Sequence, residues 1–568
     1  MQRDMLFEQA YWPADRSPEI WDITLGDLLR RGAEKIPDRV AFVEGNVATR
    51  ATRRWTYSEL LKAAERVARA LLTAFSPGER IAVWSPNSAE WILLQHGASL
   101  AGLVLVTVNP AYLDAEVQHV LSSSKAVGLF YTAAYRNTDQ RAVVATIRSS
   151  LPHLRDVICF DAWEDFCATA DIAGSTESNL GTALPAIRPD DMVQIQFTSG
   201  TTGRPKGACL HHRGLVNASR FASLRAQFPE GGVWVSAMPL FHVGGCAGSQ
   251  LGAYTQLGTF VMLTQFDAGF MLELIERERG NHVHAVPTMV ISLMDHPTRP
   301  NLDLRSLKMI MSGGTPVPAS LVRKVMGTFN CRFTITFGQT ELNGVICQTS
   351  PDDTPERQAE TIGRPSPQME VKIADPVTGE TLRVGEPGEI WARGYQAMHG
   401  YFEMREASET TLRPDGWLRT GDQASMDEHG YLRITGRLKD AIIRGGENIY
   451  PREIEDVLWA HDAIEQVAVV AVPDPKWGEV VAAVVRFAAT CRLRPTADDL
   501  HAFCRAHLAA YKTPALWFFV DEFPTTSSGK IQKFKLRELI ATGALVGQER
   551  SAAQKEGSRL RNATAPSR

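Results

Sequence analysis

The residues with the clearest chemical meaning lie between Thr198 and Gly207, where the chain reads TSGTTGRPKG. Glycines let a backbone approach an anion closely and adopt positive φ angles. Hydroxyl groups and successive N–H groups can surround phosphate oxygens, and Lys206 adds a point charge. The pattern is not a Walker A loop, because G-x-x-x-x-G-K-[ST] cannot be fitted to Gly200 or Gly203. The segment therefore indicates another kind of phosphate-binding loop.

A flexible Ser/Thr/Gly linker is the alternative interpretation of this segment. A linker requires neither a strand before it nor a Pro-Lys-Gly exit, whereas here the β-rich run Met192–Phe197 comes directly before the loop. Ligands of parallel α/β sheets bind at the loops that follow the carboxyl ends of strands. The position of the segment thus favours a binding loop.

Seven further blocks follow in a fixed order. They are PLFHVGG at 239–245, SGGTP at 312–316, FGQTE at 337–341, GWLRTGD at 416–422, GRLKD at 436–440, RGGENIYP at 444–451 and PTTSSGK at 524–530. Together with the loop, they resemble the adenylate-forming superfamily, which includes acyl-CoA synthetases, peptide-synthetase adenylation domains and firefly-type luciferases. The resemblance runs from Thr198 to Lys530, and the preceding segment Val108–Pro110 is compatible with it.

The resemblance implies a two-step activation of a carboxylate. Attack on the α-phosphate of ATP gives an acyl-adenylate and pyrophosphate, and the mixed anhydride is then open to a thiolate. Because the reacting partners are both anionic, catalysis depends on positioning and on converging cations. The resemblance also implies ATP, Mg²⁺ and the co-substrate CoA.

The resemblance implies roles for particular residues. Lys530 is expected to reach the carboxylate and the α-phosphate, and Glu341 and Thr198 are expected to hold Mg²⁺, a cation that prefers hard oxygen ligands. The implied catalytic set is Lys530, Glu341, His242 and Lys206. The implied ATP-binding set is Thr198, Ser199, Gly200, Thr201, Thr202, Gly203, Lys206, Gly313, Gly314, Thr315, Phe337, Gly338, Gln339, Thr340, Asp422, Arg437 and Lys530.

Within this set, Phe337 is expected to stack on adenine, where relatives often have Tyr, and Asp422 is expected to accept the ribose hydroxyls. Arg437 is expected to make a second ribose or phosphate contact. Thr315 departs mildly from the family, in which Ala is frequent. For Glu341, a salt-bridged structural carboxylate is the alternative, and plain structural roles remain open for Thr198, Asp422 and Arg437.

The acyl pocket is expected at His242, Val243, Gly244 and Gly245, and the segment Asn281–Thr288 resembles a further pocket-lining part. Peptide-synthetase adenylation domains usually place an Asp where this chain has His242, so an amino-acid substrate is disfavoured. The small residues predict room for a medium-chain, long-chain or bulky acid. A structural histidine and close backbone packing of a helix are the alternatives.

The resemblance also predicts that the small domain rotates about Lys439 between the two half-reactions and presents Gly445 and Gly446 on the CoA side. An ordinary exposed linker lysine is the alternative for Lys439. No carrier-protein signature follows, which favours free CoA, although a carrier protein acting in trans stays open. A luciferase-like oxygenase and a non-catalytic nucleotide-binding regulator are more remote alternatives.

Strand-like runs alternate with helical patterns and therefore predict an α/β fold with parallel sheets. The runs are 80–85, 127–131, 156–160, 192–197, 307–312 and 332–337, with 91–108 as a buried helix followed by a strand and a mostly β portion from 363 to 435. The expected domains are residues 1–437, a small mobile α+β domain at 438–546 with its own strand at 466–472, and a disordered tail at 547–568.

Composition narrows the class of protein. The chain has 568 residues and a net charge of −4, which disfavours a general nucleic-acid partner. Eight cysteines without a CxxC pair argue against a disulfide framework or structural zinc. No leader segment or membrane span is expected, so a cytoplasmic protein is predicted. Transient membrane contact and the oligomeric state are left open.

Overall fold

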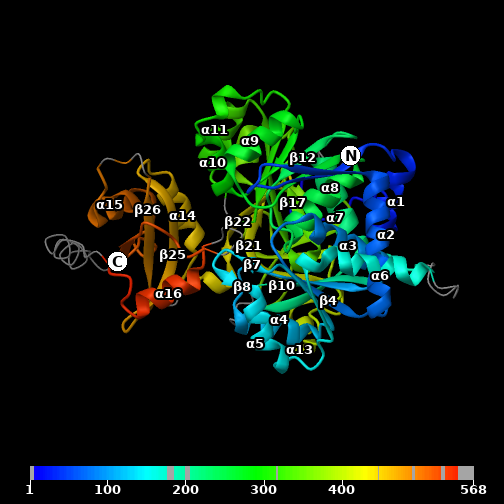
Figure 1. The fold of residues 1–568 in the computed structure, drawn as a ribbon. Coiled ribbons are helices and arrows are strands. Elements are labelled where there is room, and N and C mark those ends of the chain that lie inside the picture. Colours follow the sequence, from blue (N-terminus) through cyan, green and yellow to red (C-terminus); the bar gives the residue numbers. More distant parts are fainter. Residues whose placement is uncertain are drawn as a thin grey trace, which may run out of the picture. The chain divides into compact units, whose positions relative to one another are not determined.

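The structure is a computed structural model that describes residues 6–175, 184–198, 205–314, 317–445, 447–488, 491, 493–525 and 531–547. Several predicted site residues lie outside the described residues, namely Ser199, Gly200, Thr201, Thr202, Gly203, Thr315, Gly446 and Lys530. Nearly all of the predicted tail, residues 548–568, lies outside them as well. The chain forms two compact units (Figure 1). Unit 1 contains residues 1–386, 390–420 and 426–433, and unit 2 contains 387–389, 421–425 and 434–568.

The phosphate-loop strand belongs to a six-stranded sheet in unit 1. The order is β11 (Lys206–His211), β10 (Met192–Thr198), β5 (Val104–Val108), β4 (Arg80–Trp84), β6 (Gly128–Tyr131) and β9 (Asp156–Cys159). All neighbours are parallel except the β10–β11 pair. The apolar stretch 91–108 is confirmed as a buried helix, α3 (Ala89–Ala101), followed by β5.

A nine-stranded sheet in unit 1 carries the other blocks. Its order is β18 (Arg364–Pro365), β17 (Gly344–Gln348), β16 (Arg332–Gln339), β15 (Met309–Gly313), β14 (His282–His284), β12 (Val233–Ser236), β13 (Thr259–Leu263), β2 (Val40–Gly45) and β3 (Thr52–Thr56). Strands from β16 to β2 are parallel. Parallel strands are buried on both faces, which explains their near-continuous apolar runs. The predicted α/β class and parallel sheets are thus confirmed.

Helices connect and cover these sheets (Figure 1). In unit 1 they are α1 (Leu25–Lys35), α2 (Tyr57–Ala74), α3, α4 (Asp114–Ser124), α5 (Gln140–Ile147), α6 (Trp163–Ser175), α7 (His212–Arg225), α8 (Gln250–Thr255), α9 (Ala268–Arg277), α10 (Pro287–Asp295), α11 (Ala319–Phe329), α12 (Pro355–Glu360) and α13 (Arg405–Thr411). Local sequence signals fix their starts. For α2, the Thr56 side chain accepts from the Glu59 N–H and the Glu59 carboxylate accepts from the Thr56 N–H, which is a capping box.

The β portion expected from 363 to 435 is confirmed as a five-stranded sheet. Its order is β1 (Tyr11–Trp12), β19 (Met369–Ala374), β20 (Gly388–Gly394), β21 (Leu418–Met426) and β22 (Leu432–Arg437). The division between the two units passes through β20, β21 and β22. The domain boundary predicted after residue 437 stays a prediction.

Unit 2 has its own α+β core. Its strands are β23 (Ile442–Arg444), β24 (Glu447–Ile449), β25 (Ile464–Asp474), β26 (Gly478–Phe487) and β27 (Leu516–Phe519), and its helices are α14 (Pro451–Trp459), α15 (Ala497–His507) and α16 (Lys533–Ala541). The β25–β26 pair is antiparallel and β26–β27 is parallel. The strand expected at 466–472 lies within β25, and its apolar side chains bury against α14 and α15 in one cluster that includes Val469, Ile454 and Leu500.

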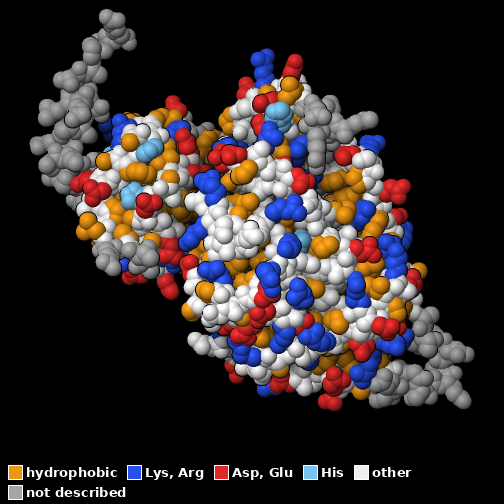
Figure 2. All heavy atoms as spheres, turned by 90° about the horizontal axis from the view of Figure 1, so that it is seen from above, with side chains coloured by type: hydrophobic (Ala, Val, Ile, Leu, Met, Phe, Trp, Pro, Cys, Tyr) orange, Lys and Arg blue, Asp and Glu red, His pale blue; other side chains and the backbone are white. Residues whose placement is uncertain are grey.

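The surface carries charged side chains of both signs, in agreement with the small net charge of −4. Lys/Arg and Asp/Glu side chains are interspersed on the face shown in Figure 2. All eight cysteines are free thiols and six of them are buried. Within the described part of the chain, no helix is long and apolar enough to cross a membrane.

Candidate active site

Thr198 is the last residue of β10, so its side chain stands at the carboxyl end of the six-stranded sheet. The predicted phosphate loop connects β10 to β11 in a hairpin register that places Thr198 opposite Lys206. The Thr198 Oγ1 also lies 3.5 Å from the Lys206 carbonyl oxygen. The two described ends of the loop are therefore held together by the strands that flank it.

Glu341 lies where the two large sheets meet. It belongs to a short 3₁₀ turn, η6 (Thr340–Leu342), directly after β16 at the carboxyl end of the nine-stranded sheet. Its Oε1 accepts hydrogen bonds from the Thr198 Oγ1 at 3.2 Å and from the Tyr401 hydroxyl at 2.9 Å. The structure thus brings together Thr198, Glu341 and Lys206, which the sequence analysis assigned to one site.

Tyr401 is a site residue that the sequence analysis missed. Backbone hydrogen bonds hold its segment against β11, since the Cys209 N–H donates to Gly400 and the Phe402 N–H donates to Gly207. The Lys206 ammonium lies 5.1 Å from the centre of the Tyr401 ring, within cation–π range. Burial, with a smaller contribution from the Glu341 carboxylate, raises the pKa of Tyr401, so its hydroxyl stays a donor. No local motif marks a tyrosine sixty positions from its partner.

The predicted adenine-side residues lie at the ends of β15 and β16. Gly313 ends β15, and a Cβ there would lie 2.2 Å from the Thr336 carbonyl oxygen, so only glycine fits. Gly314 has φ +74° and open space around its Cβ position. Phe337 is half-buried in β16. A Cβ on Gly338 would lie 2.1 Å from the Gly344 carbonyl oxygen. This edge therefore exposes backbone beside one aromatic ring.

Gln339 and Thr340 complete this edge. The Gln339 Nε2 donates to the Thr420 carbonyl oxygen at 2.8 Å. Thr340 is the first residue of the η6 turn that carries Glu341. Gln339 therefore anchors the end of β16 to the strand that leads toward Asp422.

The oxygen groups around Glu341 fit a magnesium ion held mainly by phosphates. Mg²⁺ usually takes one or two protein oxygens and leaves its other positions to substrate phosphates and water. Glu341 supplies a carboxylate and Thr198 a hydroxyl 3.2 Å from it. Among the described residues, no group of three or more His, Cys, Asp or Glu side chains could hold a metal by itself. The donor set therefore suits Mg²⁺ bound together with a nucleotide.

The predicted acyl-pocket residues begin a helix with a π-turn, η4 (Gly244–Ser249), which continues into α8. His242, Val243, Gly244 and Gly248 are partly exposed, whereas Gly245 is buried. A Cβ on Gly245 would lie 2.2 Å from the Pro239 carbonyl oxygen, but a Cβ on Gly248 would meet nothing closer than 3.6 Å. Gly245 therefore matches the close-packing alternative, and the accessible side of this helix is lined by Gly244 and Gly248.

Three other histidines of unit 1, His211, His212 and His282, have structural partners. His211 accepts from the Gly214 N–H with its Nδ1 and so caps α7, and the His212 Nδ1 accepts from the Leu25 N–H. The His282 Nε2 lies 2.9 Å from the Ala226 carbonyl oxygen. Burial lowers the pKa of each of these three imidazoles to about 4, so they are neutral at pH 7.

In unit 2, Asp422 and Arg437 are ion-paired, with 2.8 Å between the Arg437 Nε and the Asp422 Oδ1. The Asp422 side chain is only 6% exposed and the Arg437 side chain 51%. The guanidinium thus holds a buried carboxylate in a fixed orientation beside the surface. Lys439, the predicted hinge residue, is exposed in the 3₁₀ turn η7 (Leu438–Asp440).

Gly445 lies beside an exposed surface of aromatic and cationic side chains in unit 2. Its φ is +60°, and its N–H donates to the Trp477 carbonyl oxygen at 2.8 Å. Trp477 is 42% exposed, and its ring centre lies 4.8 Å from the Lys476 ammonium and 5.3 Å from the Arg444 guanidinium. We call Arg444, Lys476 and Trp477 the Trp477 surface.

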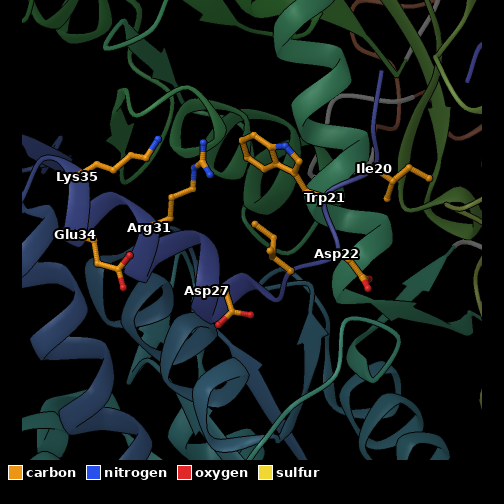
Figure 3. A pocket seen from close by; sticks show the side chains of 8 residues that line it. Ile20, Trp21, Asp22, Asp27, Arg31, Glu34 and Lys35 are labelled. Carbon is orange, nitrogen blue, oxygen red and sulfur yellow. The ribbon is translucent and has the colours of Figure 1, made fainter. Parts of the chain in front are cut away.

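A separate groove of about 390 Å³ runs beside α1 in unit 1. Figure 3 shows Arg31 and Lys35 pointing to the same side as the Trp21 ring, with Asp27 and Glu34 on the other side of the helix. Asp27 is engaged in capping α1 through Thr24. The groove contains none of the predicted site residues, so we do not assign it to the candidate active site.

Two of the glycines in η4, Gly245 and Gly248, differ in their surroundings and give a testable prediction. Gly245→Ala should lower the thermal unfolding temperature, because its methyl group would collide with backbone and overpacking costs about 1–3 kcal/mol. Gly248→Ala, the matched control, should leave it unchanged or slightly raised, because its methyl group makes ordinary contacts and Gly costs helices about 0.5–1 kcal/mol relative to Ala. Equal unfolding temperatures for both variants, measured by calorimetry, would contradict this packing.

Comparison with known proteins shows which family and which relatives the chain resembles. Residues 29–402 match the AMP-binding enzyme family, and residues 453–530 match the AMP-binding enzyme C-terminal domain. YngI of Bacillus subtilis (strain 168), which is named as an acyl-CoA synthetase, is 36% identical over 546 residues, covering 92% of this chain and 97% of YngI. The mouse mitochondrial medium-chain acyl-CoA ligase ACSF2 is 34% identical over 561 residues, covering 93% of this chain and 89% of ACSF2.

A solved structure agrees with this assignment. ATP-bound MatB from Rhodopseudomonas palustris superimposes with a TM-score of 0.79 at 27% identity, over 91% of this chain and 99% of MatB. The family match covers more than half of the chain, and both sequence relatives align over nearly their whole length. The chain therefore belongs to the AMP-binding enzyme family.

Proposed function

We propose that this protein is an ATP-dependent carboxylate–CoA ligase. It activates a medium-chain, long-chain or bulky carboxylic acid as acyl-AMP, releases pyrophosphate, and transfers the acyl group to CoA with release of AMP. The observation that carries the proposal is the meeting of Thr198, Glu341 and Lys206 at the carboxyl ends of two sheets. Support also comes from the names of the relatives, since YngI and ACSF2 are named as an acyl-CoA synthetase and a CoA ligase.

In the adenylation half-reaction, the chain must hold a triphosphate against a carboxylate. We assign the phosphate contacts to Lys206 and to the loop Ser199–Gly203, and the Mg²⁺ contacts to Glu341 and Thr198. When bound, Mg²⁺ supplies positive charge that offsets the phosphate oxygens. The Tyr401 hydroxyl keeps the Glu341 carboxylate in place, because its donated bond occupies the same Oε1 as Thr198. Lys530 is assigned the contact with the carboxylate and the α-phosphate.

Nucleoside binding is assigned to the edge formed by β15 and β16. Adenine lies between Phe337 and the Gly313–Gly314 backbone, where the absence of side chains permits close approach. The ribose hydroxyls are assigned to Asp422, whose ion pair with Arg437 orients its carboxylate. His242 and Val243 begin the acyl pocket, and the lack of an acidic group at His242 disfavours an α-amino acid.

CoA binding is assigned to the Trp477 surface in unit 2. CoA carries an adenine ring and several phosphates, and this surface offers an exposed indole between two cations. A base stacked on an aromatic side chain is stabilised by about 1–3 kcal/mol. A separate carrier protein would need no adenine platform, so the surface favours CoA over that alternative acceptor.

Lys530 and Lys439 of unit 2 are expected to serve different half-reactions, so their variants should fail at different steps. Lys530→Ala should abolish pyrophosphate release from ATP and acid while largely sparing thioester formation from preformed acyl-adenylate. Lys439→Pro should do the reverse, because proline fixes φ and blocks the rotation. The controls are Lys535→Ala, which removes a nearby exposed lysine, and Lys439→Ala, which removes the charge but not the backbone freedom. Equal loss of both half-reactions in Lys530→Ala and Lys439→Pro would exclude the two-conformation mechanism.

Tyr401→Phe tests the magnesium assignment. Removal of one buried hydrogen bond to a charged group costs about 1.5–3 kcal/mol, so we expect the Mg²⁺ concentration for half-maximal ATP binding to rise about tenfold or more. Calorimetric titration of ATP at several Mg²⁺ concentrations measures this shift independently of turnover. Tyr57→Phe is the matched control, because it removes another buried tyrosine hydroxyl, bonded to Gly258. An unchanged Mg²⁺ dependence in Tyr401→Phe would show that Tyr401 has no such role.

Trp477→Ala tests the assignment of CoA binding to the Trp477 surface. We expect the KM for CoA to rise about tenfold, in line with the loss of one stacked base, while pyrophosphate release from ATP and acid stays at the wild-type rate. Phe534→Ala, which removes another exposed aromatic ring of unit 2, serves as control. A variant with unchanged KM for CoA would remove the Trp477 surface from the proposal.

A further inference from the structure

Asn343 closes the turn that carries Glu341, although it lies outside the motifs on which the sequence analysis depends. The residue is buried, with 1% of its surface exposed. Its φ of +53° is left-handed, a conformation that asparagine adopts more readily than most other residues except glycine. Its N–H donates to the Thr340 carbonyl oxygen at 2.9 Å. The position of the η6 turn is therefore tied to the position of Asn343.

The side-chain amide of Asn343 joins this turn to two other segments. Its Oδ1 accepts from the backbone N–H of His211 at 3.3 Å, and its Nδ2 donates to the backbone carbonyl oxygen of Gln396 at 2.9 Å. The first partner can only donate and the second can only accept, so the orientation of the amide is settled. A Cβ on Gly214, in the first turn of α7, would lie 2.6 Å from the Asn343 Cγ. Glycine at that position therefore leaves room for the amide.

The two segments that the amide reaches are the ones that donate to the Glu341 carboxylate. His211 is the last residue of β11, which pairs with β10 and so with the strand that ends at Thr198. The segment that follows Gln396 carries Tyr401, and both Thr198 and Tyr401 donate to the Glu341 Oε1. The amide thus holds the turn of Glu341 between the two groups that orient its carboxylate.

We infer that Asn343 is a positioning residue for the Glu341 carboxylate, and that its amide fixes the turn after β16 against β11 and against the segment that carries Tyr401. The inference rests on the proposed function, in which Glu341 contacts Mg²⁺, and it adds the residue that orients this ligand. Loss of a partner that orients a metal ligand typically costs about 10–100-fold in metal affinity. Asn343 acts through Glu341 and contacts neither the metal nor the nucleotide.

A purely structural role is the alternative for Asn343. The amide also satisfies two backbone groups of buried residues, and leaving such groups without a partner destabilises a fold. That role predicts variants that unfold more easily but bind ATP with the same Mg²⁺ dependence as the wild type. The Mg²⁺ dependence and the unfolding temperature therefore separate the two roles.

Asn343→Gly keeps the left-handed backbone and removes the amide. We expect the Mg²⁺ concentration for half-maximal ATP binding, measured by calorimetric titration, to rise about tenfold or more. Asn330→Gly is the matched control, because Asn330 follows α11 in the same left-handed conformation, with φ +47°, and is exposed. The control should leave the Mg²⁺ dependence unchanged. An equal Mg²⁺ dependence of Asn343→Gly and the wild type would overturn the inference.

Gly214→Ala disturbs the amide without changing Asn343. Its methyl group would collide with the amide, so the Mg²⁺ requirement should rise toward the same tenfold range. Gly327→Ala is the matched control, since a Cβ on Gly327 in α11 meets nothing within 4 Å. In the double variant Asn343→Gly/Gly214→Ala the methyl group occupies the space that the amide has left. The unfolding temperature should then recover while the Mg²⁺ requirement stays raised. Recovery of both together would show a structural role and overturn the inference.

The wild type separates the inference from the function it rests on. Mg²⁺-dependent ATP binding that is identical in every variant would overturn the role of Asn343 and leave the ligase function standing. ATP binding by the wild type that does not depend on Mg²⁺ would overturn the magnesium assignment to Glu341, and the role of Asn343 with it. CoA-dependent AMP formation in the same preparations decides the ligase function by itself.

Discussion

The carboxylate of Glu341 is the point on which the candidate site depends. It accepts bonds from a residue at the end of β10 and from a residue held against β11, while it is itself carried by the turn after β16. Strand ends of two different sheets are thus fixed relative to one another through one charged group. The Lys206 ammonium lies over the ring of its tyrosine partner.

The same electrostatic constraint would account for the division of roles that we propose between the two units. A carboxylate and a triphosphate repel each other, so cations must converge on them without blocking the acyl group. In the proposed function, unit 1 would supply Lys206, the oxygen ligands and the glycine-lined helix η4. Unit 2 would supply the Asp422–Arg437 ion pair and the exposed Trp477 surface. The proposed rotation would let one small unit serve two half-reactions that need different groups.

Much of this organisation is predictable from sequence because it follows from local patterns. The apolar runs at 80–85, 192–197 and 332–337 predicted strands that the structure contains, since strands of parallel sheets are buried on both faces. The shared site of Thr198 and Glu341 was implied by the family resemblance instead, because their strands belong to different sheets and no local pattern joins them.

Other features depend on tertiary contacts and could not be predicted from local pattern. Tyr401 reaches Glu341 because its segment pairs with β11, and nothing in the surrounding sequence indicates that pairing. Gly244 and Gly245 cannot be told apart in the sequence, yet Gly244 faces accessible space and Gly245 faces the backbone of Pro239. Such details need coordinates.

The most direct test of the ligase function is to follow pyrophosphate and AMP together, with ATP and Mg²⁺, across acids from acetate to palmitate, benzoates and bulky ring acids, each with and without CoA. The account predicts that at least one acid class gives continuous AMP formation only when CoA is present, with one pyrophosphate per AMP. A single burst of pyrophosphate, without continued AMP formation when CoA is added, would indicate another acceptor and contradict the account.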